Sequence, residues 1–131
     1  MKEMIYQAER KLEILHSGIY HGCKFAILNL GTHPTAYIEC KLDNCNDYDD
    51  VRLDEIDVHG GFTFFGVAFW NKDDKTAYLG WDYAHNMDYA GYEIKFPTSL
   101  RSYGKRWTTA EIYKEVKAVI EQLNTLLVKG V

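Results

Sequence analysis

The sequence contains little cysteine and no long apolar stretch. Its three cysteines, Cys23, Cys40 and Cys45, are odd in number and form no CxxC pair, which favours reduced thiols in a cytosol over a disulfide framework. No segment approaches the roughly 18 consecutive apolar residues that a membrane-spanning helix needs. The first residues also lack the apolar region that is typical of a signal peptide. We therefore expect a cytoplasmic protein with no membrane partner.

Recognised catalytic motifs are absent as well. The sequence has no HExxH, no G-x-S-x-G and no H-x-E followed by P-C-x-x-C, which excludes the common signatures of zinc proteases, serine hydrolases and nucleobase deaminases. The net charge of -4 gives no reason to expect attraction to DNA or RNA. We expect a binding protein rather than an enzyme, with no cofactor and no bound metal.

Aromatic residues are abundant instead. They make up 15% of the chain and include ten tyrosines and three tryptophans. Aromatic side chains at this density either fill a core or line a binding surface. The length of 131 residues fits a single domain, residues 1–131, that is large enough to bury a core of its own.

Strand signals dominate the first two thirds of the chain. Between 23 and 30, alternation places Cys23, Phe25 and Ile27 on one face and Ala26, Leu28 and Leu30 on the other, so both faces are apolar. A polar stretch at 71–75 separates two further strands and predicts a hairpin with a five-residue loop. The predicted strands are 11–20, 23–30, 35–40, 61–70 and 76–83.

The last segment predicts a long helix. Thr108 and Glu111 form a capping box at its start, and Gly130 is suited to its end. The polar positions Lys114, Glu115, Lys117 and Glu121 are expected to face water. The apolar stripe comprises Ile112, Val116, Val119, Ile120, Leu123, Leu126 and Leu127.

Together these elements predict an α+β fold, a twisted antiparallel β-sheet with the long C-terminal helix packed on one face. One helix covers only one face of a sheet. We therefore expect the other apolar face to be covered by a second copy, in a homodimer or higher homo-oligomer.

The segment 43–57 is strongly acidic, with seven carboxylates and one cation, Arg52. One interpretation is a solvated acidic loop, and a second is a divalent-cation site, because hard cations take oxygen ligands. The EF-hand register fails, since Gly at position 6 and Glu at position 12 of such a loop are missing. A third interpretation is a mimic of nucleic-acid charge that blocks a basic protein.

Histidine and aspartate side chains occur beside the second hairpin. His59, Asp82, His85 and Asp88 are of the types that bind first-row metals, and a His/Asp pair is also suited to acid–base chemistry. The plainer interpretation is structural, with His59 bonding the backbone of the Gly-Gly turn that follows it.

The stretch GWDYAHNMDY, residues 80–89, is rich in aromatic rings. In a strand, Trp81 and Tyr83 share one face while Asp82 points to the other. His85 follows the strand end, where a loop begins. We expect the two rings to form a rigid wall for a ligand rather than a catalytic centre.

The segment 89–107 reverses the charge of the chain, with four cations, one anion and five aromatic residues. Aromatic faces stack on nucleotide bases, and Arg side chains bind phosphates in a forked geometry. The segment is also a long loop, and long ordered loops are more often functional than short ones. The alternative is a basic surface loop that balances the acidic one.

Three stretches resemble a family of small proteins from phages and prophages of Firmicutes. They are DYDD…IDVHGG.T at 47–63, LGWDYAH..DY at 79–89 and TAEIYKEVKAVIEQL at 109–123, and the likeness covers roughly residues 20–125. Small phage proteins of this size include anti-defence factors that act in the host cytoplasm. In size, expected fold and its aromatic-basic segment, the chain is also similar to the anti-Thoeris sponges, compact α+β oligomers that sequester cyclic ADP-ribose-type signals.

The resemblance implies a phage-encoded anti-defence protein that sequesters a small anionic, nucleotide-derived signal without turning it over. Two alternatives are a protein-binding, anti-CRISPR-like inhibitor that uses the acidic loop, and a small metal-dependent hydrolase of such a signal. No sponge residue is carried over by position, so the expected ligand-binding residues follow from the chemistry of the segments above. They are His59, Trp81, Tyr83, His85, Tyr89, Tyr92, Arg101, Tyr103, Lys105, Arg106 and Trp107.

Overall fold

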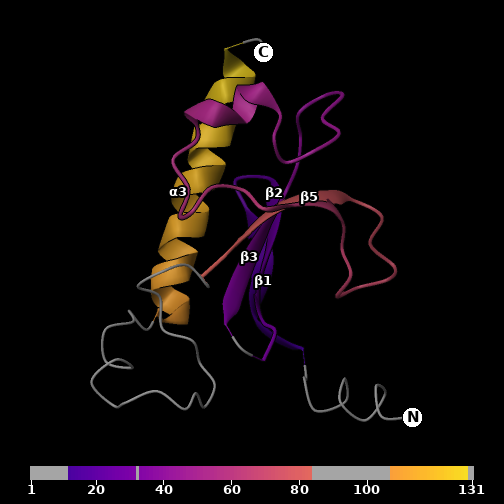
Figure 1. Ribbon diagram of the computed structural model, residues 1–131, viewed down its shortest axis with the longest axis vertical. Coiled ribbons are helices and arrows are strands. Elements are labelled where there is room, and N and C mark those ends of the chain that lie inside the picture. Colours follow the sequence, from indigo (N-terminus) through magenta and orange to yellow (C-terminus); the bar gives the residue numbers. More distant parts are fainter. Residues whose placement is uncertain (1–11, 32, 84–106, 130–131) are drawn as a thin grey trace.

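The computed structural model describes residues 12–31, 33–83 and 107–129. A five-stranded antiparallel sheet packs against one long C-terminal helix, which confirms the predicted α+β fold (Figure 1). The elements are β1 (Glu13–Tyr20), β2 (Cys23–Asn29), β3 (Pro34–Glu39), the 3₁₀ helix η1 (Val51–Glu55), β4 (Phe64–Val67), β5 (Ala77–Asp82) and α3 (Thr109–Val128).

The strand order in the sheet is β1-β2-β3-β5-β4. A two-residue turn at His21 and Gly22 joins β1 to β2, and both residues have positive φ, 50° and 78°. Such left-handed pairs match the right-handed twist of the flanking strands. The three N-terminal strands therefore lie where alternation and turn residues predict them.

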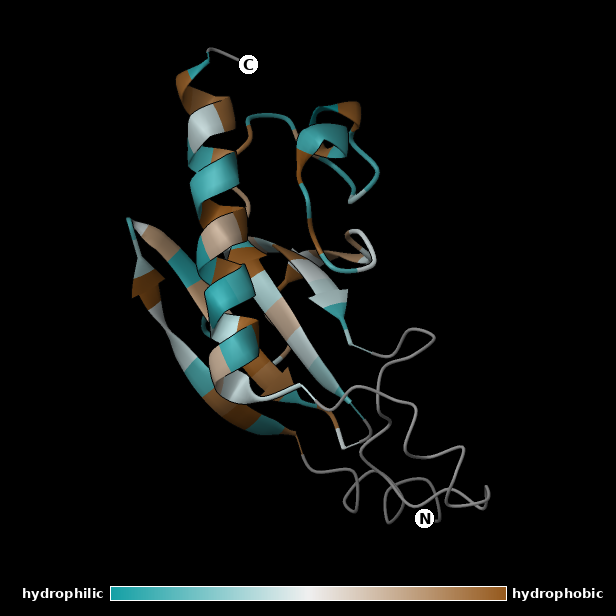
Figure 2. Ribbon diagram, turned by 90° about the vertical axis from the view of Figure 1, so that its left-hand side faces the viewer, coloured by the Kyte–Doolittle hydropathy of each residue, from teal (hydrophilic) through white to brown (hydrophobic). Residues whose placement is uncertain are grey.

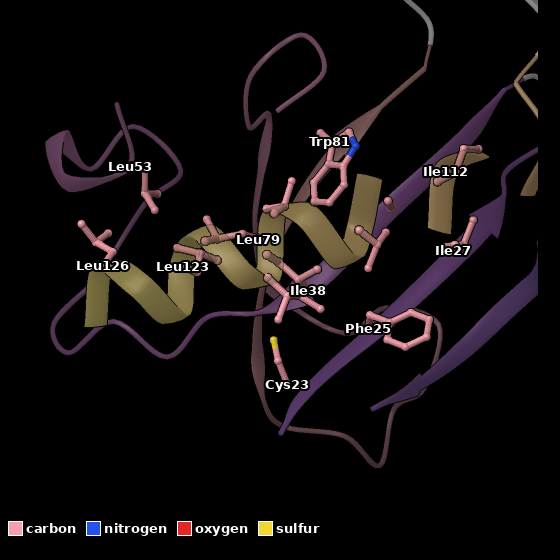
Figure 3. Close-up of a cluster of buried hydrophobic side chains, with 14 of the residues drawn as sticks. Cys23, Phe25, Ile27, Ile38, Leu53, Leu79, Trp81, Ile112, Leu123 and Leu126 are labelled. Carbon is pink, nitrogen blue, oxygen red and sulfur yellow. The ribbon is translucent and has the colours of Figure 1, made fainter. Parts of the chain in front are cut away.

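Helix α3 begins at the predicted capping box, with the Thr108 side chain accepting from the Glu111 N–H and the Glu111 side chain accepting from the Thr108 N–H. Its apolar stripe is buried against β1, β2 and β3, and Figure 3 shows side chains of the sheet pointing towards it. Burying one such side chain contributes about 1.5–3 kcal/mol. No helix in the described part of the chain is long and apolar enough to cross a membrane.

The hairpin formed by β4 and β5 has a longer loop than the sequence predicts. Val67 pairs with Ala77, so the connection between β4 and β5 is residues 68–76 rather than the five-residue loop expected at 71–75. Ala68, Phe69 and Trp70 leave the strand, although their apolar character is typical of one. The reason is tertiary, because these side chains pack on the sheet face that α3 does not cover.

The loop 68–76 covers this second face. Phe69 and Trp70 contact the ring of Tyr37 on β3, with ring centroids 5.5 and 4.6 Å apart. At the far side of the loop, Asp74 Oδ1 lies 3.3 Å from Lys24 Nζ on β2, and Asp74 Oδ2 accepts from the hydroxyl of Tyr78 at 2.6 Å. The hydrogen bond from that hydroxyl is the main cause that lowers the pKa of Asp74.

The reason for expecting a homo-oligomer is therefore wrong. Ala26 and Leu28, which were expected to need a second copy, are only 2% and 0% exposed within one chain. They pack with Tyr37, Tyr78 and Ala68 in a second cluster, separate from the core under α3. Association between copies stays a prediction. The second sheet face does not support it, because that face is covered within one chain.

Candidate functional site

Three aromatic rings from distant parts of the chain meet beside the start of α3. The imidazole of His59 stacks on the ring of Tyr83, with centroids 4.7 Å apart and planes inclined by 13°. Trp107 completes the group, with its centroid 5.0 Å from each of the other two. These residues form the His59–Tyr83–Trp107 cluster.

Each ring is positioned by a simple local feature. His59 lies in a turn in which the Gly61 N–H donates to the Val58 carbonyl at 3.0 Å, and Gly60 supplies the positive φ of 69°. Tyr83 directly follows β5, and Trp107 immediately precedes the helix cap at Thr108. The cluster therefore joins a turn, a strand end and a helix start.

A carboxylate from α3 binds to two of these segments. Glu115 Oε1 accepts a hydrogen bond from the hydroxyl of Tyr83, and Oε2 accepts from the backbone N–H of His59 at 2.6 Å. The hydroxyl of Tyr83 in turn accepts from the indole Nε1–H of Trp81 at 3.0 Å. A hydrogen-bonded chain therefore runs from the core to the turn that carries His59.

The expectation that Glu115 faces water is wrong. Its side chain is half-buried, because donors from two other segments of the chain converge on it. Glu115 is the residue of this cluster that the sequence reading missed. Its position three residues after Ile112 and four before Val119, at the margin of the apolar stripe, is the signal that could have identified it.

A second polar side chain of α3 holds the same segment. The Asp57 N–H donates to Gln122 Oε1 at 2.7 Å, and Gln122 Nε2 donates to the Asp57 carbonyl at 3.0 Å. Gln122 follows Glu115 by two helical turns, so both lie on one side of α3. Earlier in the chain, η1 lies beside the C-terminal half of α3 (Figures 1 and 2), where Leu53 joins the core.

Burial corrects part of the expected aromatic wall. Trp81 and Tyr83 do share one face, but that face is the one under α3, and their side chains are 1% and 0% exposed. At 1% exposure, the ring of Trp81 is closed to a ligand in this arrangement. Figure 3 shows it among the buried side chains of the core. His59 and Trp107 are half-buried, whereas Tyr83 is fully buried.

Seven of the expected ligand-binding residues lie outside the described residues. They are His85, Tyr89, Tyr92, Arg101, Tyr103, Lys105 and Arg106. Two of them, Lys105 and Arg106, immediately precede Trp107 in the sequence.

The carboxylate of Asp82 points away from Trp81 and Tyr83, as alternation predicts. Asp82 Oδ2 accepts from the hydroxyl of Thr63 at 3.3 Å. Within residues 12–31, 33–83 and 107–129, no three His, Cys, Asp or Glu side chains are grouped so that they could hold a metal ion.

The acidic segment is folded and only partly neutralised. Arg52 Nη2 donates to Asp50 Oδ2 at 2.7 Å and to the Asp43 carbonyl at 3.0 Å. Hydrogen bonds from Arg52 lower the pKa of Asp50 to about 2. The other six carboxylates are exposed: Asp43, Asp47, Asp49, Asp54, Glu55 and Asp57.

The thiols are free, and burial sets their reactivity. Burial is the main cause that raises the pKa of Cys23 to about 11 and that of Cys40 to about 12. Since the thiolate is the nucleophile, roughly a thousandth of the Cys23 thiol is reactive at pH 8. We expect iodoacetamide to alkylate half-buried Cys45 first, and Cys23 and Cys40 more than about 100-fold slower than an ordinary exposed thiol.

Mass spectrometry of timed samples measures the three rates. The slow thiols should accelerate as the pH rises towards 11, and all three should react alike in denaturant. Rapid alkylation of Cys23 in the folded chain at pH 8 would contradict the effect of burial.

Comparison of the chain with protein-family models, with curated proteins and with solved structures gives no match.

Proposed function

We propose that the protein binds and sequesters a small anionic, nucleotide-derived ligand at the His59–Tyr83–Trp107 cluster, without turning it over. The observation that supports this function best is the convergence of three rings from separate segments, with centroids 4.7–5.0 Å apart. Tyr83 is fully buried, so the half-buried rings of His59 and Trp107 are the ones that a base would contact.

Positively charged residues precede Trp107 in the sequence. Trp107 directly precedes Thr108, the N-cap of α3, and the positive dipole end of a helix favours an anion. The cations Lys105 and Arg106 precede Trp107 directly in the sequence, and Arg101 lies six residues before it. We infer that these side chains bind the phosphates while the rings contact the base. The setting, anti-defence in a host cytoplasm, is part of this proposal and rests on the resemblance to small phage proteins.

Calorimetry with a panel of linear and cyclic nucleotides, including AMP and ADP-ribose, tests the proposal. Charged hydrogen bonds to phosphate contribute about 1.5–3 kcal/mol, so Arg106→Ala should weaken binding roughly 10- to 100-fold, with a marked salt dependence. A matched control is Lys72→Ala, which removes an exposed cation from the loop 68–76. This variant should bind like wild type.

Analysis of the bound nucleotide separates sequestration from hydrolysis. Heat-denatured complex should release the nucleotide unchanged, whereas release of products would favour the metal-dependent hydrolase. Equal affinity in wild type and Arg106→Ala, or no binding of any member of the panel, would contradict the proposal.

A second candidate function is inhibition of a basic protein by the acidic segment. The observation that favours it is apolar exposure among the carboxylates, because Tyr48 is 43% exposed and Val51 is 77% exposed. Interfaces combine apolar anchors with complementary charge. A wild-type chain that binds no nucleotide would make this the better function.

A further inference from the structure

The carboxylate of Glu115 connects two parts of the chain that no strand pairing joins. Its two oxygens accept from the hydroxyl of Tyr83 and from the backbone N–H of His59, residues that lie 32 and 56 positions away in the sequence. The same two residues form the stacked pair, with ring planes inclined by only 13°. One side chain of α3 therefore contacts both members of the stack.

The ring of Tyr83 is fixed from the core side as well. Its hydroxyl accepts from Trp81 Nε1–H at 3.0 Å and donates to Glu115. Trp81 is 1% exposed, so this hydrogen bond lies in the core beneath α3. The position of the Tyr83 ring is thus set by the core, and Glu115 brings the turn with His59 to that ring.

A carboxylate suits this position better than any other side chain of its size. Two donors, an O–H and an N–H, converge on it, and an ionised carboxylate accepts at both oxygens. A glutamine offers one acceptor oxygen and would point an N–H₂ donor at one of the two partners. Hydrogen bonds to a charged acceptor are also roughly twice as strong as neutral ones.

We propose that Glu115 is the positioning residue of the ligand site, which holds the His59 ring parallel to Tyr83 in the arrangement that receives a ligand. This inference rests on the proposed function for its ligand, but its structural part is testable on the ligand-free chain. Glu115 acts through His59 and Tyr83 and does not itself contact the ligand.

The first experiment is NMR of the ligand-free protein. A ring proton above an aromatic face is shifted upfield, so the His59 ring signals report on the stack. Glu115→Gln removes one acceptor at unchanged size and should move these signals towards their unstacked positions, and Glu115→Ala should move them further. A role in stability alone would leave the signals of the folded state unchanged.

The matched control is Glu121→Gln. Glu121 lies on the same helix, six residues after Glu115, and also accepts from a tyrosine hydroxyl, but from that of Tyr20 on β1 rather than from the cluster. It undergoes the same chemical change and should leave the His59 signals in place. A folded Glu115→Gln variant with wild-type His59 signals would overturn the proposal.

The second experiment is calorimetry of the same variants with AMP and ADP-ribose as probes. Loss of one charged hydrogen bond behind the stack should weaken binding about tenfold in Glu115→Gln and not in Glu121→Gln. Displaced His59 signals combined with unchanged affinity would overturn the positioning role. If wild type binds neither probe while Glu115→Gln still displaces the His59 signals, the proposed function fails and the structural role of Glu115 stands.

Discussion

Replacing Trp81 by alanine is expected to lower the free energy of unfolding by about 3–5 kcal/mol, the cost of emptying a fully buried aromatic site. The indole is 1% exposed in the core beneath α3, and it donates the hydrogen bond that fixes the Tyr83 hydroxyl. The variant therefore leaves a cavity and also removes a donor. Urea unfolding followed by far-UV circular dichroism measures the change.

The matched control is Trp107→Ala. Trp107 is half-buried at the edge of the same aromatic group, so its removal should cost clearly less stability and should weaken nucleotide binding instead. The two tryptophans thus separate core packing from ligand contact. A loss below about 1 kcal/mol in Trp81→Ala would contradict the assignment of this ring to the core.

A methyl group at Gly80 is expected to destabilise the chain by about 1–3 kcal/mol, the usual cost of overpacking. A Cβ at this position would lie 2.5 Å from Cδ1 of Tyr37 and 3.2 Å from the carbonyl oxygen of Ala36. The Tyr37 ring cannot move aside easily, because it is 4% exposed and contacts Phe64, Phe69 and Trp70. Chemical denaturation of Gly80→Ala tests the effect.

Gly18→Ala is the control for this change. It places a methyl group on another strand of the sheet, at an ordinary 3.5 Å from the Phe25 ring, so little loss is expected. A smaller side chain at Tyr37 should relieve the crowding, so Gly80→Ala should cost less in a Tyr37→Leu background than in wild type. Equal stability of Gly80→Ala and wild type would show that the second face is loosely packed.

If Gly80→Ala is as costly as expected, the second face of the sheet is a packed core rather than an interface. Its cover, the loop 68–76, belongs to the same chain and is held by Asp74 to both Lys24 and Tyr78. A partner copy would have to bind elsewhere on the protein.

The sequence by itself determined the elements whose signals are local. The capping box at Thr108 and the apolar stripe of α3 depend on residues within one or two helical turns, and the hairpin from β1 to β2 depends on alternation and on the turn at His21 and Gly22. Backbone hydrogen bonding and side-chain period act over these short distances. Such features can therefore be read without knowing what packs where.

The arrangement of the candidate site could not be predicted from local sequence signals. The residue types of His59, Tyr83 and Trp107 were recognised in the sequence, but their proximity was not, because it depends on three segments meeting beside α3. Trp81 was expected on a binding surface and lies in the core, since alternation gives the face of a residue and not what covers that face.

Tertiary structure alone decided the roles of the loop 68–76 and of Glu115. Phe69 and Trp70 have the apolar character of strand residues, yet they fold back because the second sheet face would otherwise lie open to water. Glu115 resembles the solvated residues around it until Tyr83 and His59 bring donors to both of its oxygens. A charged group is stable in a half-buried position only when such partners are present, and they come from 32 and 56 residues away.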